Sequence, residues 1–184
     1  VVFRVERAAD IRQAIAFARR SGLRPVISGG SEAWLVAREL AQARVPVILN
    51  ALQDLPTDFD RIGSRLDNAA LLARAGVLIA FSDDDSYVHA VRQQAGNAVA
   101  HGLPWDAALA AITANPAEIF GLAAARGRIA AGQVADLVLW DGDPLEVTTL
   151  ADRVWIAGRA VEMRSRQTEL RDRYRGRLPQ ESNP

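Results

Sequence analysis

Short apolar runs alternate with amphipathic stretches over the first 82 residues, and this alternation restricts the chain to a parallel α/β arrangement. The runs are rich in Val, Ile and Leu, which is typical of strands buried on both faces. They span Val1–Glu6, Arg24–Ser28, Val45–Asn50 and Gly76–Ser82. Between them the sequence predicts helices over Ala8–Ser21, Glu32–Ala43 and Leu66–Ala75. Strand–helix–strand order favours parallel strands joined by right-handed crossovers.

The second half of the chain predicts helices first and then a small β region. We expect helices over Tyr87–His101 and Pro104–Thr113 and a helical turn over Asn115–Gly121. Short strands separated by glycines are predicted over Gly127–Ala130, Ala135–Trp140, Arg153–Ala157 and Arg159–Met163, with a hairpin turn at Gly158. A charged helix follows from Ser165 to Tyr174. The predicted domains are therefore 1–126, which is α/β, 127–163, which is β, and 164–184, a helix with a polar tail.

Composition excludes several kinds of chemistry within this chain. All 22 basic residues are Arg, so no Lys is present to form a Schiff base, act as a base or carry a metal-bridging carbamate. There is no Cys, which excludes disulfides and thiolate sites. The formal net charge is zero, so we expect no nucleic-acid partner. The apolar runs are far shorter than the roughly 18 residues of a membrane span, so we expect no membrane partner.

The acidic triplet Asp83, Asp84 and Asp85 is the sharpest local signal for chemistry. It directly follows an apolar strand, and ligands of parallel α/β folds bind at the carboxyl ends of strands. A carboxylate there can hold a cation or take a proton from water. The alternative is that the three residues cap the following helix. Among the three, Asp83 is the candidate catalytic and metal-binding residue.

Other strand ends offer candidate substrate-binding residues. A Gly-rich turn after the second strand would cradle an anion with backbone N–H groups, or would simply be a tight turn. The Arg after the first strand would hold a substrate carboxylate or form a structural ion pair. The candidates are Arg4, Ser28, Gly29, Gly30 and Asn50. The two histidines, His89 and His101, lie twelve residues apart within a predicted helix and lack metal-ligand spacing.

From Ala107 to Val161 the sequence resembles one known family. It reads AALAAITANPAEIFGL, then GRIAAGQVADLVLWDGDPLE, then VWIAGRAV. This run is similar to the C-terminal end of the imidazolonepropionase-like group of the amidohydrolase superfamily. The matching residues are Thr113, Asn115, Pro116, Ala117, Gly127, Ile129, Gly132, Ala135, Asp136, Leu137, Val138, Asp141, Gly142, Asp143, Pro144, Val154, Gly158 and Val161. The resemblance extends over most of 1–174.

The resemblance implies a fold: the last four βα units of a (β/α) TIM-type barrel, followed by part of a small β-sandwich and a C-terminal helix. A complete barrel needs roughly 250 residues, so 184 residues are expected to be the C-terminal portion of one. The β-sandwich would be completed by N-terminal strands that this chain lacks. An open half-barrel should form homo-oligomers or pair with the missing half.

The resemblance also implies roles. Family members are usually metal-dependent hydrolases whose ligands are a His-x-His pair, two further His and an Asp on the last strand, which Asp83 matches. Here Arg4 and the turn after Ser28 stand where two ligand His residues are expected. We therefore expect a hydrolase of C–N bonds in small molecules, inactive as this fragment, with a divalent metal (zinc) in the complete enzyme. The alternative is a non-catalytic binding or scaffold protein of the same ancestry that has lost its metal ligands.

Overall fold

The N-terminal part of the structure is a four-stranded parallel sheet with helices packed on it. The computed structural model describes residues 1–82 and 90–175. The sheet order is β1-β2-β3-β4, and all three pairings are parallel. The strands are β1 (Val2–Val5), β2 (Val26–Gly29), β3 (Val47–Leu49) and β4 (Ile79–Phe81). Three of them lie inside predicted apolar runs, and β2 extends one residue beyond its run, so the predicted α/β class is confirmed.

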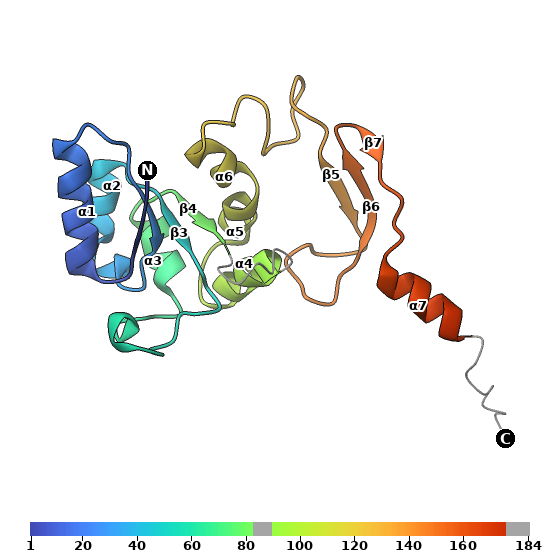
Figure 1. The fold of residues 1–184 in the computed structure, drawn as a ribbon, viewed down its shortest axis with the longest axis horizontal. Helices are drawn as coiled ribbons and strands as arrows, with labels where there is room; N and C mark the ends of the chain where they lie inside the picture. Colours follow the sequence, from blue (N-terminus) through green and yellow to red (C-terminus); the bar gives the residue numbers. More distant parts are fainter. Residues whose placement is uncertain (83–89, 176–184) are drawn as a thin grey trace.

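Helices alternate with these strands as the periodicity predicts (Figure 1). The segment expected as one helix over 32–43 divides into a 3-10 turn and a short α-helix, because Val36 is not in a helical conformation. The helical elements of this part are α1 (Ala8–Arg20), η1 (Ala33–Val36), α2 (Ala37–Ala43), η2 (Phe59–Arg61) and α3 (Asn68–Arg74). The core between sheet and helices is aliphatic, with Ile11, Leu40 and Leu72 fully buried.

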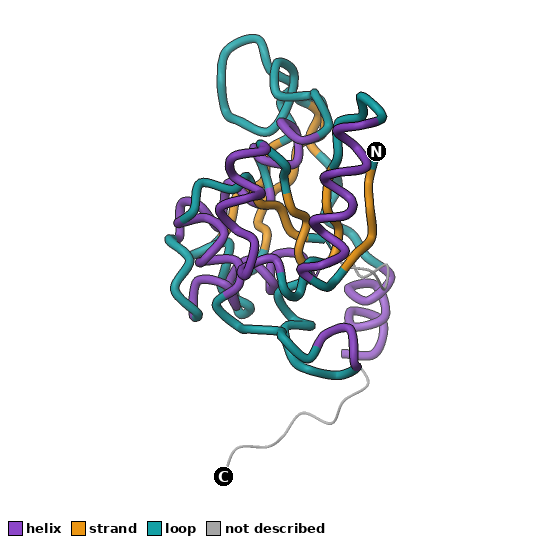
Figure 2. The backbone as a smooth tube through the Cα atoms, turned by 90° about the vertical axis from the view of Figure 1, so that its left-hand side faces the viewer, coloured by secondary structure: helices purple, strands orange, loops and turns teal. Residues whose placement is uncertain are grey.

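The two faces of the sheet have different roles. Cα partners in a parallel sheet point to the same face, and the row Ile27, Val47 and Ile79 belongs to the core under the helices. The alternate row is Arg4, Ser28, Ile48 and Ala80, which lies on the opposite face. Figure 2 shows the strands side by side with helices packed along them. The polar residues of the alternate row, Arg4 and Ser28, therefore lie on the face opposite the core, near the carboxyl ends of their strands.

Three helices connect the parallel sheet to the small β region (Figure 1). They are α4 (Ala90–Ala100, as described), α5 (Trp105–Ile112) and α6 (Ala114–Ile119). The segment Asp141–Leu145 docks the β region onto them. The Trp105 indole donates to the Asp143 carboxylate at 2.9 Å, and Leu145 is 4% exposed against the core. The Arg92 guanidinium lies 4.6 Å from the Trp140 ring centroid.

The small sheet is antiparallel, in the order β5-β6-β7. Its strands are β5 (Leu137–Trp140), β6 (Ala151–Ile156) and β7 (Arg159–Ala160), followed by α7 (Arg166–Arg175). Ala157 and Gly158 both have positive φ, which matches the predicted two-residue hairpin turn. The predicted strand over Gly127–Ala130 is wrong. Among the described residues it has no strand to pair with, and Ile129 remains 90% exposed.

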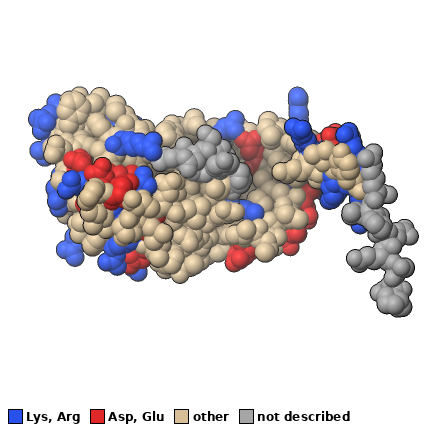
Figure 3. All heavy atoms as spheres, turned by 60° about the horizontal axis from the view of Figure 1, so that its bottom comes forward, with Lys and Arg blue, Asp and Glu red and all other residues tan. Residues whose placement is uncertain are grey.

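Charged side chains of both signs are interspersed on the face drawn in Figure 3. No helix within residues 1–82 and 90–175 is long and apolar enough to cross a membrane.

Candidate functional site

A small polar recess lies at the carboxyl edge of the parallel sheet, where the alternate row of side chains ends. We call it the carboxyl-edge recess. Its volume is about 10 Å³, close to that of one water molecule. It is lined by Glu6, Ser28, Gly29, Ser31, Ile48, Leu49, Asn50, Gln53, Asp54, Arg61 and Ser82. Strand ends supply most of the lining, and the loop after β3 supplies Gln53, Asp54 and Arg61.

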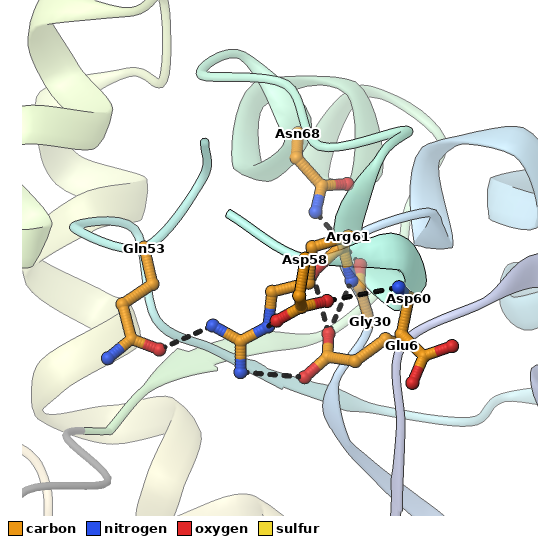
Figure 4. A network of polar contacts seen from close by, with 8 residues as sticks. Glu6, Gly30, Gln53, Asp58, Asp60, Arg61 and Asn68 are labelled. Carbon is orange, nitrogen blue, oxygen red and sulfur yellow. Dashed lines mark hydrogen bonds and ion pairs between the residues drawn. The ribbon is translucent and has the colours of Figure 1, made fainter. Parts of the chain in front are cut away.

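Glu6 and Arg61 form the central ion pair of the recess (Figure 4). Arg61 Nη2 lies 3.3 Å from Glu6 Oε1, and the two side chains are 18% and 15% exposed. Arg61 Nη1 donates to Gln53 Oε1 at 2.7 Å, and its Nε lies 3.6 Å from Asp58 Oδ2. The guanidinium thus ties the loop after β3 to the end of β1.

The other oxygen of Glu6 holds the turn after β2. Glu6 Oε2 accepts from the Ser31 backbone N–H at 3.0 Å and from the Ser31 hydroxyl at 2.6 Å. Glycine suits position 29 because its φ of 93° is rarely adopted by residues with a side chain, and a Cβ there would displace the Glu6 carboxylate, 2.5 Å away. The Gly-rich turn thus binds an anion of the protein itself, the carboxylate of Glu6.

Asp54 is the unusual ionisable group of the recess. It is 5% exposed, and its Oδ2 has no hydrogen-bond partner among the described residues. The pKa of the Asp54 carboxyl is raised to about 7, first by burial and then by the negative charge of Glu6, while the positive charge of Arg61 opposes both. Near neutral pH this carboxyl therefore exists in both protonation states.

Buried amides of α4 fix the backbone around the recess. Gln94 is fully buried; it accepts from the Ala51 N–H at 3.1 Å and donates to the Ser82 carbonyl at 2.9 Å. Asn97 donates to the Ala51 carbonyl at 2.7 Å. One helix thus links the carboxyl ends of β3 and β4, which sets the position of Asn50 and Ser82.

The structure brings together some of the predicted site residues and separates others. Ser28, Gly29 and Asn50 all line the carboxyl-edge recess. Gly30 does not: it is buried with a φ of 69°, and its carbonyl accepts from Asn68 Nδ2 at 3.0 Å. Arg4 is exposed and lines a separate hollow of about 300 Å³ beside Glu6, Asp58 and Arg61. Binding of substrate by any of these residues remains a prediction.

The candidate catalytic and metal-binding residue, Asp83, lies outside the described residues. Within 1–82 and 90–175 no group of three or more His, Cys, Asp or Glu side chains is placed to hold a metal ion. Glu6 is already paired with Arg61, so it is not available as a ligand without losing that ion pair. The described residues therefore do not fit a catalytic zinc, which typically needs three protein ligands.

Sequence reasoning did not single out Asp54, Arg61, Gln94 or Asn97. The first two lie in a loop with no hydrophobic period, and the last two look like ordinary polar residues of a helix. Their role becomes clear only in the structure, where α4 and the loop after β3 pack against the carboxyl ends of the strands. A larger hollow, about 970 Å³, lies elsewhere, between α5, α6 and the small sheet. Its lining is mostly apolar, so it is a poorer candidate for catalysis.

Comparison with known proteins assigns the family. The model of the amidohydrolase family matches residues 4–162. An amidohydrolase from Thermotoga maritima superposes with a TM-score of 0.82 at 34% sequence identity, over 89% of this chain and 43% of that one. The chain thus belongs to the amidohydrolase family and spans less than half the length of this relative.

Two further proteins are similar to this chain, one in part of its sequence and one in its fold. Amidohydrolase tasK of Hapsidospora irregularis is 48% identical over 60 residues, which is 33% of this chain and 6% of tasK. A zinc-bound adenosine deaminase from Xanthomonas campestris has a TM-score of 0.60 at 20% identity, over 96% of this chain and 50% of its own; at this identity it supports the fold alone. The resemblance of the segment from Ala107 to Val161 is confirmed at the level of the family.

Proposed function

We propose that this chain is the C-terminal portion of an amidohydrolase barrel that, when complete, hydrolyses an amide-like or cyclic C–N bond in a small molecule. We further propose that the portion alone is inactive. One observation carries the proposal: four parallel strands end in a polar recess within a chain that covers 43% of a related amidohydrolase. Ligands of such folds bind at this edge.

The described residues support substrate binding and orientation at this edge. Ser28 and Asn50 present a hydroxyl and an amide to the recess. The Glu6–Arg61 ion pair keeps the loop after β3 against the strand ends. Asp83 lies two residues after the end of β4 in sequence, and we assign it the handling of the proton of the attacking water.

Zinc in the complete enzyme remains part of the proposal. The Xanthomonas relative carries bound zinc, and such an ion lowers the pKa of a bound water. The described residues supply no ligand set for it. We therefore assign them no step that depends on a metal.

A chimera tests this function. The part of the Thermotoga maritima amidohydrolase that this chain does not cover would be joined to this chain and assayed with N-acyl amino acids, dipeptides and cyclic amides. We expect turnover by the chimera, none by this chain alone, and loss of turnover in Asp83→Asn. Asp152→Asn, an exposed carboxylate on β6, is the matched control and should keep full activity.

The second candidate is a non-catalytic binding protein of the same ancestry. One observation favours it: the first two strands do not end in metal ligands. The first carries Arg4, and the second ends in a Gly-rich turn that is closed by Glu6. A folded chimera that binds these compounds without hydrolysing any of them would support it over the hydrolase.

A further inference from the structure

Asp54 has a buried acceptor without a partner, whereas the carboxylate and amide oxygens of Glu6, Gln53 and Asn50 beside it are engaged. Glu6 accepts from Ser31 and pairs with Arg61. Gln53 Oε1 accepts from Arg61, and Asn50 Oδ1 accepts from the Leu52 N–H. Asp54 Oδ2 has no donor among the described residues, although the residue is only 5% exposed; of the buried atoms without a partner, it is the one that belongs to the recess lining. Buried carboxylate oxygens without a donor are rare and costly.

Arg61 is the cation among the described lining residues, and its geometry explains why it does not donate to Asp54. Its two terminal nitrogens are directed to Gln53 and Glu6, and its Nε faces Asp58. Figure 4 shows this guanidinium held between Gln53 on one side and Glu6 and Asp58 on the other. Since these nitrogens are already engaged, Arg61 leaves Asp54 Oδ2 without a donor.

Size and charge define which partner suits this oxygen. The recess has about 10 Å³ of free volume, so only a group the size of a water molecule enters it. Glu6 and Asp54 contribute two negative charges when ionised, against one positive charge from Arg61. A small donor with a positive charge satisfies both the free oxygen and the excess charge, whereas a carboxylate or phosphate would be repelled.

We propose that Asp54 binds a primary ammonium group at the carboxyl-edge recess, which makes the ligand of the complete barrel an amino-bearing small molecule. The substrate class rests on the proposed hydrolase function, but ammonium binding itself does not require turnover. The burial that raises the pKa of Asp54 is consistent with a site completed by a cationic ligand, since such a ligand restores the ionised carboxylate.

Methylammonium chloride is the probe, and tetramethylammonium chloride at equal ionic strength is its control, because the latter carries the charge without an N–H donor. At about ten times its dissociation constant, methylammonium should raise the midpoint of thermal unfolding by roughly 3–6 °C over the control salt. Asp54→Asn should abolish this difference, and Asp60→Asn, an exposed carboxylate of the same loop, should keep it. Equal midpoints in the two salts, the result expected if only a water occupies the recess, would overturn the proposal.

A second measurement on the unsubstituted chain decides the matter if Asp54→Asn does not fold. Carbon-13 NMR titration of the Asp54 carboxyl should give a lower pKa in methylammonium than in tetramethylammonium, because the bound cation favours the ionised form. An unchanged pKa would overturn the proposal. Methylammonium binding without turnover in the chimera would leave this inference standing and refute the hydrolase; turnover without methylammonium binding would do the reverse.

Discussion

At the scale of single residues, Glu6 organises the carboxyl edge, because one carboxylate joins β1, the turn after β2 and the loop after β3. Glu6→Gln keeps the size of the side chain and removes its charge, so the half-buried Arg61 loses its main partner. We expect a loss of about 1–3 kcal/mol in the free energy of unfolding, measured by chemical denaturation.

Glu6→Gln should also change a second measurable quantity, the pKa of Asp54. The charge of Glu6 helps to raise the pKa of Asp54, so its removal should lower that pKa toward the ordinary carboxyl range. Glu39→Gln is the control, since it breaks an exposed pair with Arg12 and should barely change either quantity. Equal effects of the two substitutions on stability would show that the Glu6–Arg61 pair contributes no more than a surface ion pair.

Asp54 should give the folded protein a pH dependence of definite sign. Its pKa is about 7 in the folded state against 3.8 ordinarily, so the folded state binds more protons between these values. The contribution of Asp54 to stability therefore falls as pH rises from about 4 to about 7 and stays at its minimum above that. Relative to the unsubstituted chain, Asp54→Asn should gain a few kcal/mol across this window, as an order of magnitude. Parallel stability–pH profiles of the two proteins would contradict the assignment.

At the scale of secondary-structure elements, α4 acts as a clamp on the strand ends. Gln94→Leu keeps a buried side chain of similar volume but leaves the Ala51 N–H and the Ser82 carbonyl without partners. About 1–3 kcal/mol should be lost for each orphaned group, seen in denaturant unfolding and as faster hydrogen exchange at Ala51. Gln93→Leu on the same helix should cost much less, because no hydrogen bond joins the Gln93 side chain to the described residues of this edge. Similar losses would mean that α4 stabilises by packing alone.

Helices and strands could be predicted from the sequence where the spacing of apolar residues alone determines them. The apolar runs around Ile27, Val47 and Ile79 predict β2, β3 and β4 because both faces of these strands are buried. The run Gly127–Ala130 has strand-like residues, but a strand also needs a neighbour to pair with, and the sequence does not contain that information. Asp54 and Arg61 were missed for a related reason, since their role depends on tertiary contacts of a loop without any period.

At the scale of the whole molecule, the described residues form a body with exposed apolar surface and two open sheet edges. β1 and β4 each pair on one side only within the described residues. A groove of about 970 Å³ between α5, α6 and β5 is lined by Leu109, Ile112 and Val138 and has the 90% exposed Ile129 at its rim. Surfaces of this kind usually mark an interface in soluble proteins. The chain spans 43% of the Thermotoga relative, so a part equivalent to the rest of that relative is one candidate to cover this surface.

We therefore expect this chain to self-associate when it is alone and to form a defined complex when the uncovered part of the Thermotoga amidohydrolase is added. Size-exclusion chromatography with light scattering measures both states. Ile129→Lys places a charge in the groove and should reduce association, whereas Phe59→Lys, which alters an equally exposed apolar residue far from the groove in sequence, should not. The free energy of unfolding should change little in either variant, because both side chains are about 90% exposed and lose few contacts. A stable, monodisperse monomer of the unsubstituted chain would contradict the prediction, since the groove would then be tolerated in water without a partner.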